Sequence, residues 1–483
     1  MSSPPPPPRR PPGILHRVVE ETGLLSLSSA PFDVKLLCLQ RFARMFAYGL
    51  STLVLVAYLS ALAVPKTDIG LFMTLTLAGD VCLSFALTLF ADALGRRAVL
   101  ALGAALVTAS GLAFALSGQF WVLLAAAVVG VISPSGNEIG PFRAIEESIV
   151  AQLTDARKRS DVYAWYSLVG LAGAACGCMA CGWVLQHLTG TLGWGSVRAY
   201  RAIYVGYALL GLVKLGLTML LSRAVESENK DKNKKKKSTA QDRTTREGEA
   251  RPLLENEATE LVNEPPKRGF RALLPDISKE SMPVVMTLCF LFALDSFGSG
   301  LAPLSWITYY FKSQFDIEEG ELGSIFFATQ IIAGASMLVA SSLAKRFGNV
   351  NTMIFTHLPS QIFRALLGVP RSPRLALIFL VLNASTQSMD TGPRSAFLAA
   401  AVLPAERTAV MGTVNVVRTT AQSLGPLLTG ILVDRGLFWV TFVASGGVKI
   451  VYDLGLLAFF KNKERERERA ERLRARRDEE TVS

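Results

Sequence analysis

Two short motifs place ionisable residues inside long apolar stretches of the chain. The first, GNEIGPFR, runs from Gly136 to Arg143, and the second, MDTGPR, runs from Met389 to Arg394. Equivalent residues are equally spaced: 390 − 138 = 252 for the acids, 392 − 140 = 252 for the glycines and 393 − 141 = 252 for the prolines. An ionisable group in an apolar segment is costly, and its repetition in two halves is typical of a binding site. The candidate functional residues here are Glu138, Arg143, Asp390 and Arg394.

Each motif contains a glycine followed by a proline. We expect Gly140-Pro141 and Gly392-Pro393 to interrupt their helices, because proline lacks an amide donor and crowds the preceding turn. A backbone carbonyl freed beside a cavity can bind a substrate, an ion or a water. The simpler alternative is a packing kink, which is common in membrane helices.

The composition indicates a polytopic membrane protein. Half of the 483 residues are hydrophobic, the mean hydropathy is +0.35, and apolar runs recur at near-regular intervals. The net charge of +11 lies mainly in short loops and in the tails, so we expect no nucleic-acid partner. No nucleotide-binding or hydrolase motif is present, which argues against an enzyme or an ATP-driven pump.

The cysteines and histidines predict neither a disulfide framework nor a metal site. Cys176, Cys178 and Cys181 share one apolar segment, but only Cys178 and Cys181 are one helical turn apart. The surrounding glycines and alanines favour close helix packing over soft-metal binding. His16, His187 and His357 are far apart in the sequence, so we expect no histidine metal cluster and no cofactor.

A helix that crosses a bilayer needs about 20 predominantly apolar residues. This criterion predicts an all-α membrane protein with twelve transmembrane helices as two six-helix repeats. The predicted spans are near 36–64, 69–91, 98–117, 120–150, 161–187, 199–222, 281–311, 321–343, 350–369, 375–403, 409–433 and 437–460. The predicted domains are a disordered N-terminus (1–35), a first bundle (36–223), a disordered linker (224–275), a second bundle (276–460) and a charged tail (461–483).

Basic residues predict the orientation, because they accumulate in cytoplasmic loops. One side of the predicted membrane carries Arg96, Arg97, Arg157 to Arg159, the lysines between Lys230 and Lys237, Lys345, Arg346 and Arg407. The opposite side carries fewer, including Lys66, Lys312 and Arg371. Both termini are therefore expected to be cytoplasmic. The linker motif EARPLL (Glu249 to Leu254) has the form of an endosomal or vacuolar sorting signal, although such motifs also arise by chance. The predicted location is the plasma membrane or a vacuolar or endosomal membrane.

The repeat extends beyond the two opening motifs. Arg44 and Gly49 align with Asp295 and Gly300 at an offset of 251, and Gly177 and Gly182 align with Gly425 and Gly430 at 248. The segment from Gly211 to Lys214 resembles that from Gly446 to Lys449. Duplication of a six-helix unit explains these offsets, which are nearly constant until the sixth span.

With twelve spans, two repeats and LFADALGRR (Leu89 to Arg97) between spans two and three, the chain resembles a major facilitator superfamily transporter. The resemblance covers about 36–223 and 276–460. Ala91, Asp92, Gly95, Arg96 and Arg97 match the loop signature of that family, in which the loop helps to hold the inward-closed arrangement. The second copy, LAKRFGNV, keeps Gly348 but has Lys345 in place of the acid, which implies asymmetric gating.

A second family signature is matched less well. Drug/proton antiporters have a Gly-Pro in span five, where this chain reads GAACGCMACG (Gly173 to Gly182) with Cys178 in place of the proline. The eleventh span contains the better copy, SLGPLLTG. The departure argues against a drug-efflux function without excluding export.

The resemblance implies that spans one, four, seven and ten surround a central cavity. These spans carry the candidate substrate and proton-coupling residues Arg44, Glu138, Arg143, Asp295, Asp390 and Arg394, together with Arg41. Counting helical rise suggests that Arg44 meets Glu138. In the second half the preferred pairs are Arg394 or Arg418 with Asp295 and Asp390, and Asp390 and Arg394 are also i and i+4 neighbours. Lys214 and Lys449 are expected outside the cavity, with a partner on a neighbouring helix or a snorkelling side chain. The alternative is that all these pairs are fixed structural ion pairs.

These features together predict a secondary transporter that moves a small-molecule substrate across a lipid bilayer by alternating access. Protons are the expected driving ion, because burial favours a neutral carboxylic acid whereas a nearby arginine favours the carboxylate. We expect the protein to function as a monomer. The alternatives are an uncoupled facilitator and a non-transporting receptor or scaffold on the same fold.

The predicted topology can be tested by cysteine labelling of sealed cells. A cysteine at Lys235, in the linker, should react with a membrane-impermeant maleimide only after permeabilisation, whereas a cysteine at Arg371 should react in intact cells. The parent chain, with its six native cysteines, gives the background. Labelling at Lys235 in intact cells would contradict the predicted orientation.

Overall fold

The computed structural model describes residues 24–130, 132–135, 141–155, 158–226, 281–347, 349–394 and 406–459, apart from the side chains of 84–93, 141, 338, 341, 345, 349, 350 and 407–409. These residues form helices and connecting segments, with no strand among them. Seven of the helices within these ranges are long and apolar enough to cross a membrane. The all-α membrane fold is thereby confirmed.

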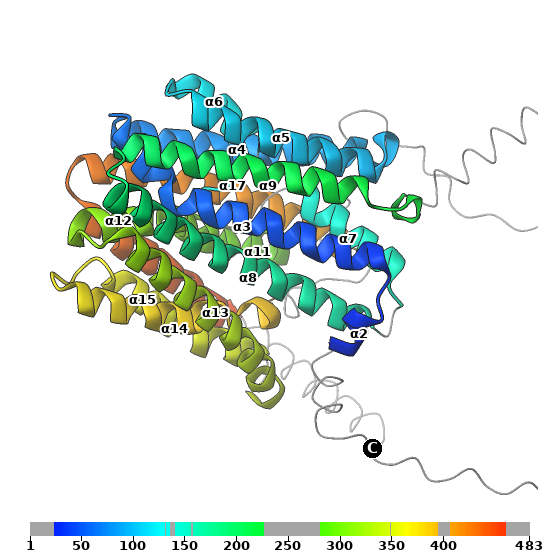
Figure 1. The fold of residues 1–483 in the computed structure, drawn as a ribbon. Coiled ribbons are helices and arrows are strands. Elements are labelled where there is room, and N and C mark those ends of the chain that lie inside the picture. Colours follow the sequence, from blue (N-terminus) through cyan, green and yellow to red (C-terminus); the bar gives the residue numbers. More distant parts are fainter. Residues whose placement is uncertain are drawn as a thin grey trace, which may run out of the picture. The chain divides into compact units, whose positions relative to one another are not determined.

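The first half of the chain contains eight α-helices and two short helical turns in its described part (Figure 1). The α-helices are α2 (Leu24–Ser28), α3 (Phe32–Ala61), α4 (Lys66–Leu94), α5 (Arg96–Leu116), α6 (Phe120–Val129), α7 (Pro141–Leu153), α8 (Arg159–Gln186) and α9 (Ser196–Met219). A π-helix, His187–Thr191, extends α8, and a 3-10 helix, Arg223–Val225, follows α9.

The second half begins with a helix in two pieces. Its helices are α11 (Met282–Leu301), α12 (Leu304–Phe315), α13 (Glu319–Phe347), α14 (Asn349–Leu366), α15 (Pro373–Gln387) and α17 (Arg407–Asp434), followed by Phe438–Phe459. Each of the twelve predicted spans thus corresponds to one helix or to consecutive shorter helices.

Three predicted spans are not continuous helices. In span four, α6 ends at Val129, residues 132–135 are not helical, and α7 is described from Pro141. Span ten has a turn between Gln387 and a helical stretch at 391–394. Span seven, expected as one helix over 281–311, is divided at Ala302 and Pro303. The cause is proline: Pro303 has a ψ of 159° and caps α12 from outside the helix.

The proline of the second Gly-Pro motif lies in the first turn of a resumed helix. Pro393 follows a stretch that is helical from Thr391, whereas Pro141 is the first described residue of α7. Proline is tolerated there, because an amide in the first turn has no intrahelical acceptor. Each interruption therefore precedes its proline, while Gly140 itself lies outside the described residues.

The chain divides into two compact units. The first unit comprises 1–225 and 303–334, and the second comprises 226–302 and 335–483. The first unit therefore includes α12 and part of α13, which the predicted division at 224–275 assigned to the second bundle. Contacts within this unit explain the difference. The hydroxyl oxygen of Tyr309 on α12 lies 3.4 Å from Ser60 Oγ on α3. Gly323 on α13 packs against Gly182 on α8.

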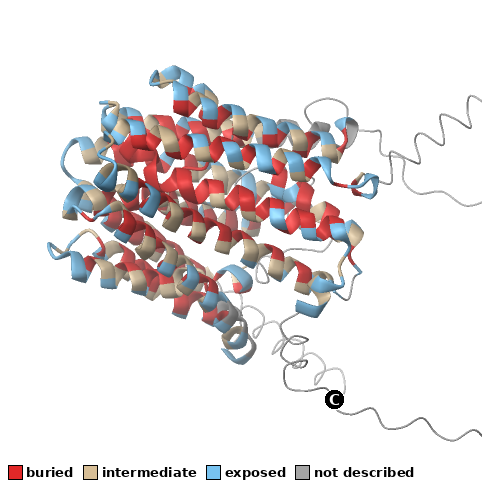
Figure 2. Cartoon of the chain, viewed as in Figure 1, coloured by how far each residue is buried: buried red, intermediate tan, exposed pale blue. Residues whose placement is uncertain are grey.

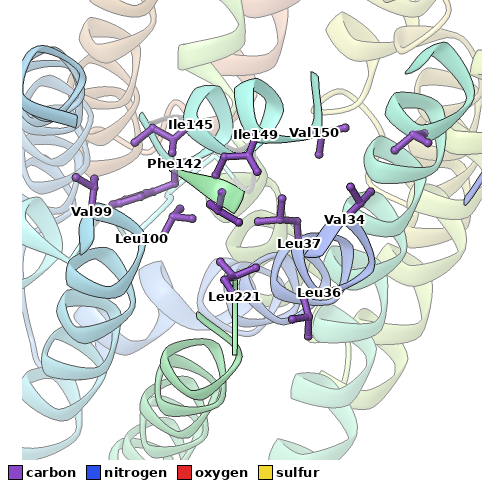
Figure 3. Close-up of a cluster of buried hydrophobic side chains, with 12 residues drawn as sticks. Val34, Leu36, Leu37, Val99, Leu100, Phe142, Ile145, Ile149, Val150 and Leu221 are labelled. Carbon is purple, nitrogen blue, oxygen red and sulfur yellow. The ribbon is translucent and has the colours of Figure 1, made fainter. Parts of the chain in front are cut away.

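Helix α3 is the centre of the first unit. In its most apolar 18-residue stretch, 83% of the residues are buried, and the helix packs against α8 and α9. Figure 2 shows the corresponding concentration of buried residues along α3. At one end of the unit, Val34 and Leu37 of α3 meet Leu100, Phe142 and Ile149 in an apolar cluster (Figure 3). This cluster holds α7 against α3 and α5.

The second unit has its own apolar interior. Leu288 and Phe292 of α11 pack with Val414 of α17 and with Tyr452 and Leu456 of the last helix. These contacts bring α11, α14, α17 and the last helix together. The polar residues described below come from the same helices.

Glycines set the closest helix crossings, and they repeat between the units. Gly49 on α3 meets Gly177 on α8, where a Cβ on Gly49 would lie 2.3 Å from the Ala174 carbonyl oxygen. The aligned pair, Gly300 on α11 and Gly425 on α17, is similarly close. Small residues let helix backbones approach where lipid gives no hydrophobic driving force. The aligned glycines in the sequence therefore mark the same crossing in each unit.

This packing predicts that a larger residue at Gly49 will destabilise the protein. Gly49→Val should lower the apparent melting temperature of the detergent-purified protein, because overpacking costs roughly 1–3 kcal/mol. Gly216→Val is the matched control, since a Cβ on Gly216 meets no atom within 4 Å. Equal melting temperatures for the two variants would contradict this account of the crossing.

Candidate functional site

The first unit contains a buried ion pair between α3 and α7. Arg44 donates to both carboxylate oxygens of Glu146, with Nη1–Oε1 at 2.5 Å and Nη2–Oε2 at 2.8 Å. Both side chains are almost completely buried, at 1% and 0% exposure. Two parallel charge-assisted hydrogen bonds fix the separation and the relative orientation of the two groups.

Two further helices contribute to Glu146. The hydroxyl of Tyr166 on α8 donates to Glu146 Oε2, and Lys214 Nζ on α9 lies 3.9 Å from Glu146 Oε1. The guanidinium of Arg41 lies over the Tyr166 ring, with Cζ 4.1 Å from the ring centroid. One carboxylate therefore joins α3, α7, α8 and α9. We refer to Arg44, Glu146, Tyr166 and Lys214 as the Glu146 cluster.

The structure gives Arg44 a partner that the sequence analysis did not select. Glu138 lies outside the described residues, and Glu146, eight positions later, makes the contact with Arg44. The expected contact of Arg44 with Glu138 therefore stays a prediction, because residues 136–140 are not described. Arg143 lies on the exposed side of α7, with 47% of its side chain accessible, and pairs with Glu147.

The second unit has a corresponding cluster around Asp295 on α11. Arg394 Nη1 lies 2.8 Å from Asp295 Oδ2, and Lys449 Nζ, on the last helix, lies 2.7 Å from Asp295 Oδ1. Arg394 Nη2 also lies 2.8 Å from Asp390 Oδ2. The structure thus shows the expected contacts of Arg394 with both acids. We refer to Asp295, Asp390, Arg394 and Lys449 as the Asp295 cluster.

A histidine adjoins this cluster that the sequence analysis considered only as a metal ligand. His357 on α14 is buried, with Nδ1 2.8 Å from Asp453 Oδ1 and Nε2 3.8 Å from Asp295 Oδ1. Asp453 belongs to the last helix, one turn beyond Lys449. The sequence feature that could have revealed this site is the pair Lys449 and Asp453, two charged residues at i and i+4 within an apolar span.

The two lysines were expected outside the cavity with neighbouring partners, and both are buried. Lys214 is 1% exposed and Lys449 is 6% exposed, and each is directed at the central carboxylate of its own unit. Arginine and acid, however, exchange places between the units. Arg44 on α3 aligns with Asp295 on α11, and their partners, Glu146 and Arg394, follow the helix interruptions of spans four and ten.

An open pocket of about 440 Å³ lies beside the Asp295 cluster. Its walls include Phe292 of α11, Arg394, and Met411, Asn415 and Arg418 of α17. This volume is in the range of small-molecule sites, which are mostly apolar with a few polar groups. The pocket combines both features.

The predicted gating loop is a single residue in the structure. Gly95 separates α4 from α5 and has a φ of 99°, a left-handed conformation that favours glycine. Arg96 Nη1 donates to Gln152 Oε1 at 2.7 Å, and Arg97 donates to the carbonyl oxygen of Met219. Asp92 lies at the end of α4, and its side chain is outside the described set. The arginines thus connect the loop to the ends of α7 and α9.

Comparison with known proteins identifies the family. The sequence profile of the Major Facilitator Superfamily matches residues 37–304 and 288–480. The chain belongs to the major facilitator superfamily. This is a family of membrane transporters, and membership agrees with the all-helical fold and with the repeated six-helix units.

Among the relatives is an uncharacterized membrane protein of Saccharomyces cerevisiae, 37% identical over 438 residues, which covers 89% of this chain and 94% of the yeast protein. Solved structures with a similar fold include a bacterial homolog of the human lysosomal transporter Spinster (TM-score 0.63, 15% identity), covering 89% of this chain and 97% of that one. A D-xylose–proton symporter (TM-score 0.64, 13% identity) has the same coverage. The nucleoside transporter NupG (TM-score 0.63, 14% identity) covers 89% and 100%.

Substitutions at different residues of the Glu146 cluster should reduce the stability of the protein by different amounts. Glu146→Gln should be the most destabilising change, because it removes the carboxylate that Arg44 and Lys214 share. The free energy of unfolding should fall by roughly 3–5 kcal/mol. Arg44→Gln should cost less, since Lys214 remains beside Glu146. The double variant Arg44→Gln/Glu146→Gln should be more stable than Glu146→Gln alone.

Thermal unfolding of purified variants measures this order. The matched control is the exposed pair Arg143 and Glu147, whose removal should change stability by about 0.2–1 kcal/mol. Additive losses in the Arg44 and Glu146 double-mutant cycle would show that the two side chains are not energetically coupled.

Proposed function

We propose that this protein is a secondary active transporter that moves a small solute by alternating access, driven by protons. The observation that carries the proposal is the Asp295 cluster, in which one buried carboxylate contacts cations from two other segments in a chain of this family. Intramembrane carboxylates and histidines are typical components of proton relays. The D-xylose–proton symporter, which has a similar fold, supports the proposal.

The cluster suits coupling because its partners come from different parts of the unit. Asp295 is on α11, Arg394 follows the interruption of span ten, and Lys449 is on the last helix. A shift of any one of these segments removes a cation from Asp295. An uncompensated buried carboxylate takes up a proton, so helix movement and proton binding become linked.

We place the proton-exchanging group at Asp390 and at the pair His357 and Asp453. The imidazole of His357 faces Asp453 and Asp295, with Lys449 bound to the same Asp295 and the Tyr452 ring 5.9 Å away. A histidine between two carboxylates can bind a proton when one of them loses its cation. Glu138, outside the described residues, is the corresponding candidate in the first half.

The proposal extends to topology and gating. Both termini are cytoplasmic, and the loop containing Gly95, Arg96 and Arg97 belongs to the cytoplasmic gate with Asp92. The substrate is a small molecule, as it is for the xylose and nucleoside transporters of similar fold. The protein acts as a monomer in the plasma membrane or in a vacuolar or endosomal membrane.

Metabolite profiling of sealed membrane vesicles, with and without an imposed pH gradient, tests the function. A solute that accumulates only with the gradient supports coupled transport. Equilibration that ignores the gradient indicates an uncoupled facilitator, and an unchanged metabolite profile contradicts transport. Vesicles from cells that lack the protein provide the baseline.

Substitution of the proposed proton-exchanging residues should abolish one activity, gradient-driven accumulation, and leave another. His357→Gln and Asp390→Asn should abolish gradient-driven accumulation but retain solute exchange, because exchange requires no net proton movement. Glu138→Gln should do the same if the first half also exchanges a proton. His187→Gln is the matched control, since His187 is exposed at the end of α8. Wild-type accumulation in His357→Gln or Asp390→Asn would remove that residue from the mechanism.

A further inference from the structure

Arg418 on α17 is a cation without a carboxylate partner among the residues that the structure describes. Its Nε donates to Ser296 Oγ at 3.3 Å, and its Cζ lies 5.7 Å from the Phe292 ring centroid. No described carboxylate lies within 4 Å of it, in contrast to Arg44, Arg394 and Lys449. It lies 418 − 407 = 11 residues into α17, or about 16 Å along the helix. A charge at this depth is costly and marks a functional site.

The charges around Asp295 leave one positive charge in excess. Among the residues that the structure describes here, four cations, Arg364, Arg394, Arg418 and Lys449, accompany three acids, Asp295, Asp390 and Asp453. With His357 neutral, the sum is 4 − 3 = +1, and protonation of His357 would increase it. Both Nη atoms of Arg394 bind acids, and Arg364 is occupied by Ser445 and by the Ala302 carbonyl oxygen. Arg364 and Arg418 thus both lack a carboxylate partner among the described residues, and of these two only Arg418 borders the pocket.

Arg418 also borders the open pocket described above. Arg394, Asn415 and Thr391 supply the other polar parts of its wall, and Phe292 and Met411 supply apolar parts. With Nε held by Ser296, the remaining guanidinium nitrogens are available as donors. Guanidinium groups bind carboxylate and phosphate groups through two parallel hydrogen bonds.

We propose that the pocket binds a small organic anion, with its carboxylate or phosphate on Arg418 and its apolar part against Phe292 and Met411. This inference rests on the proposed function in treating the anion as the transported substrate. A bound carboxylate supplies the missing negative charge and balances the four cations and three acids counted above. Asn415, which is exposed in the pocket, provides a further polar contact.

Binding to the full-length purified protein tests the proposal without a transport assay. Benzoate, phenyl phosphate and benzamide present the same ring with a carboxylate, a phosphate and a neutral group, respectively. At least one of the two anions should raise the melting temperature saturably, whereas benzamide should not. The stronger of the two identifies the preferred head group. Equal protection by benzamide, or no protection by either anion, would overturn the proposal.

Two variants locate the site. Arg418→Gln should weaken anion binding roughly tenfold or more, equivalent to about 1.4 kcal/mol, and should leave the unliganded melting temperature unchanged or higher, because it removes an uncompensated charge. Asn415→Asp, at an exposed position, should also weaken binding by adding a negative charge to the pocket. Arg435→Gln, at the far end of α17, should bind as the wild type does. Wild-type affinity in Arg418→Gln and Asn415→Asp would contradict the assignment.

The outcome is separable from that of the transport proposal. Anion binding without any transported solute would support this site and reject the transporter function. Gradient-driven accumulation of a neutral or cationic solute, with no anion protection, would support transport and reject the anion site.

Discussion

A charge placed among transmembrane helices has to be neutralised by another part of the protein, and this requirement organises both units. Glu146 receives its cations and its hydroxyl donor from three helices other than its own. Asp295 is surrounded in the same way by Arg394, Lys449 and His357. Removal of one partner from such a network is far more damaging than removal of a surface pair. The carboxylates therefore hold specific helices together, and any movement of those helices has an electrostatic consequence.

The glycine crossings make these short contacts possible. At Gly49 and Gly177, α3 packs against α8, and at Gly300 and Gly425, α11 packs against α17. In each six-helix repeat these are the first and fifth spans. In the first unit this crossing lies on the two helices that carry Arg44 and Tyr166, and in the second on those that carry Asp295 and Arg418. Close packing at the glycines thus fixes the relative positions of the helices, and the charged side chains fill the space that remains between them.

Much of the fold followed from the sequence, because twelve apolar stretches and a constant repeat offset constrain a membrane protein strongly. The contacts of Arg394 with Asp390 and Asp295 followed from i and i+4 spacing and from repeat alignment. The partnership of Arg44 with Glu146 did not, because residues 132–135 are not helical, so depth cannot be estimated by counting residues along a single helix. His357 was missed because its partner, Asp453, lies 96 residues later in the sequence, and the pair forms only when α14 packs against the last helix.

The lysine present in both units bears on how the two halves diverged after duplication. Exchanging an arginine and an acid between two helices requires at least two substitutions, and a buried carboxylate without a cation would be unstable between them. Lys214 and Lys449 occupy the same repeat position and reach the carboxylate whether it is on the fourth span or on the first. A lysine at this position therefore compensates the central carboxylate in either arrangement of arginine and acid.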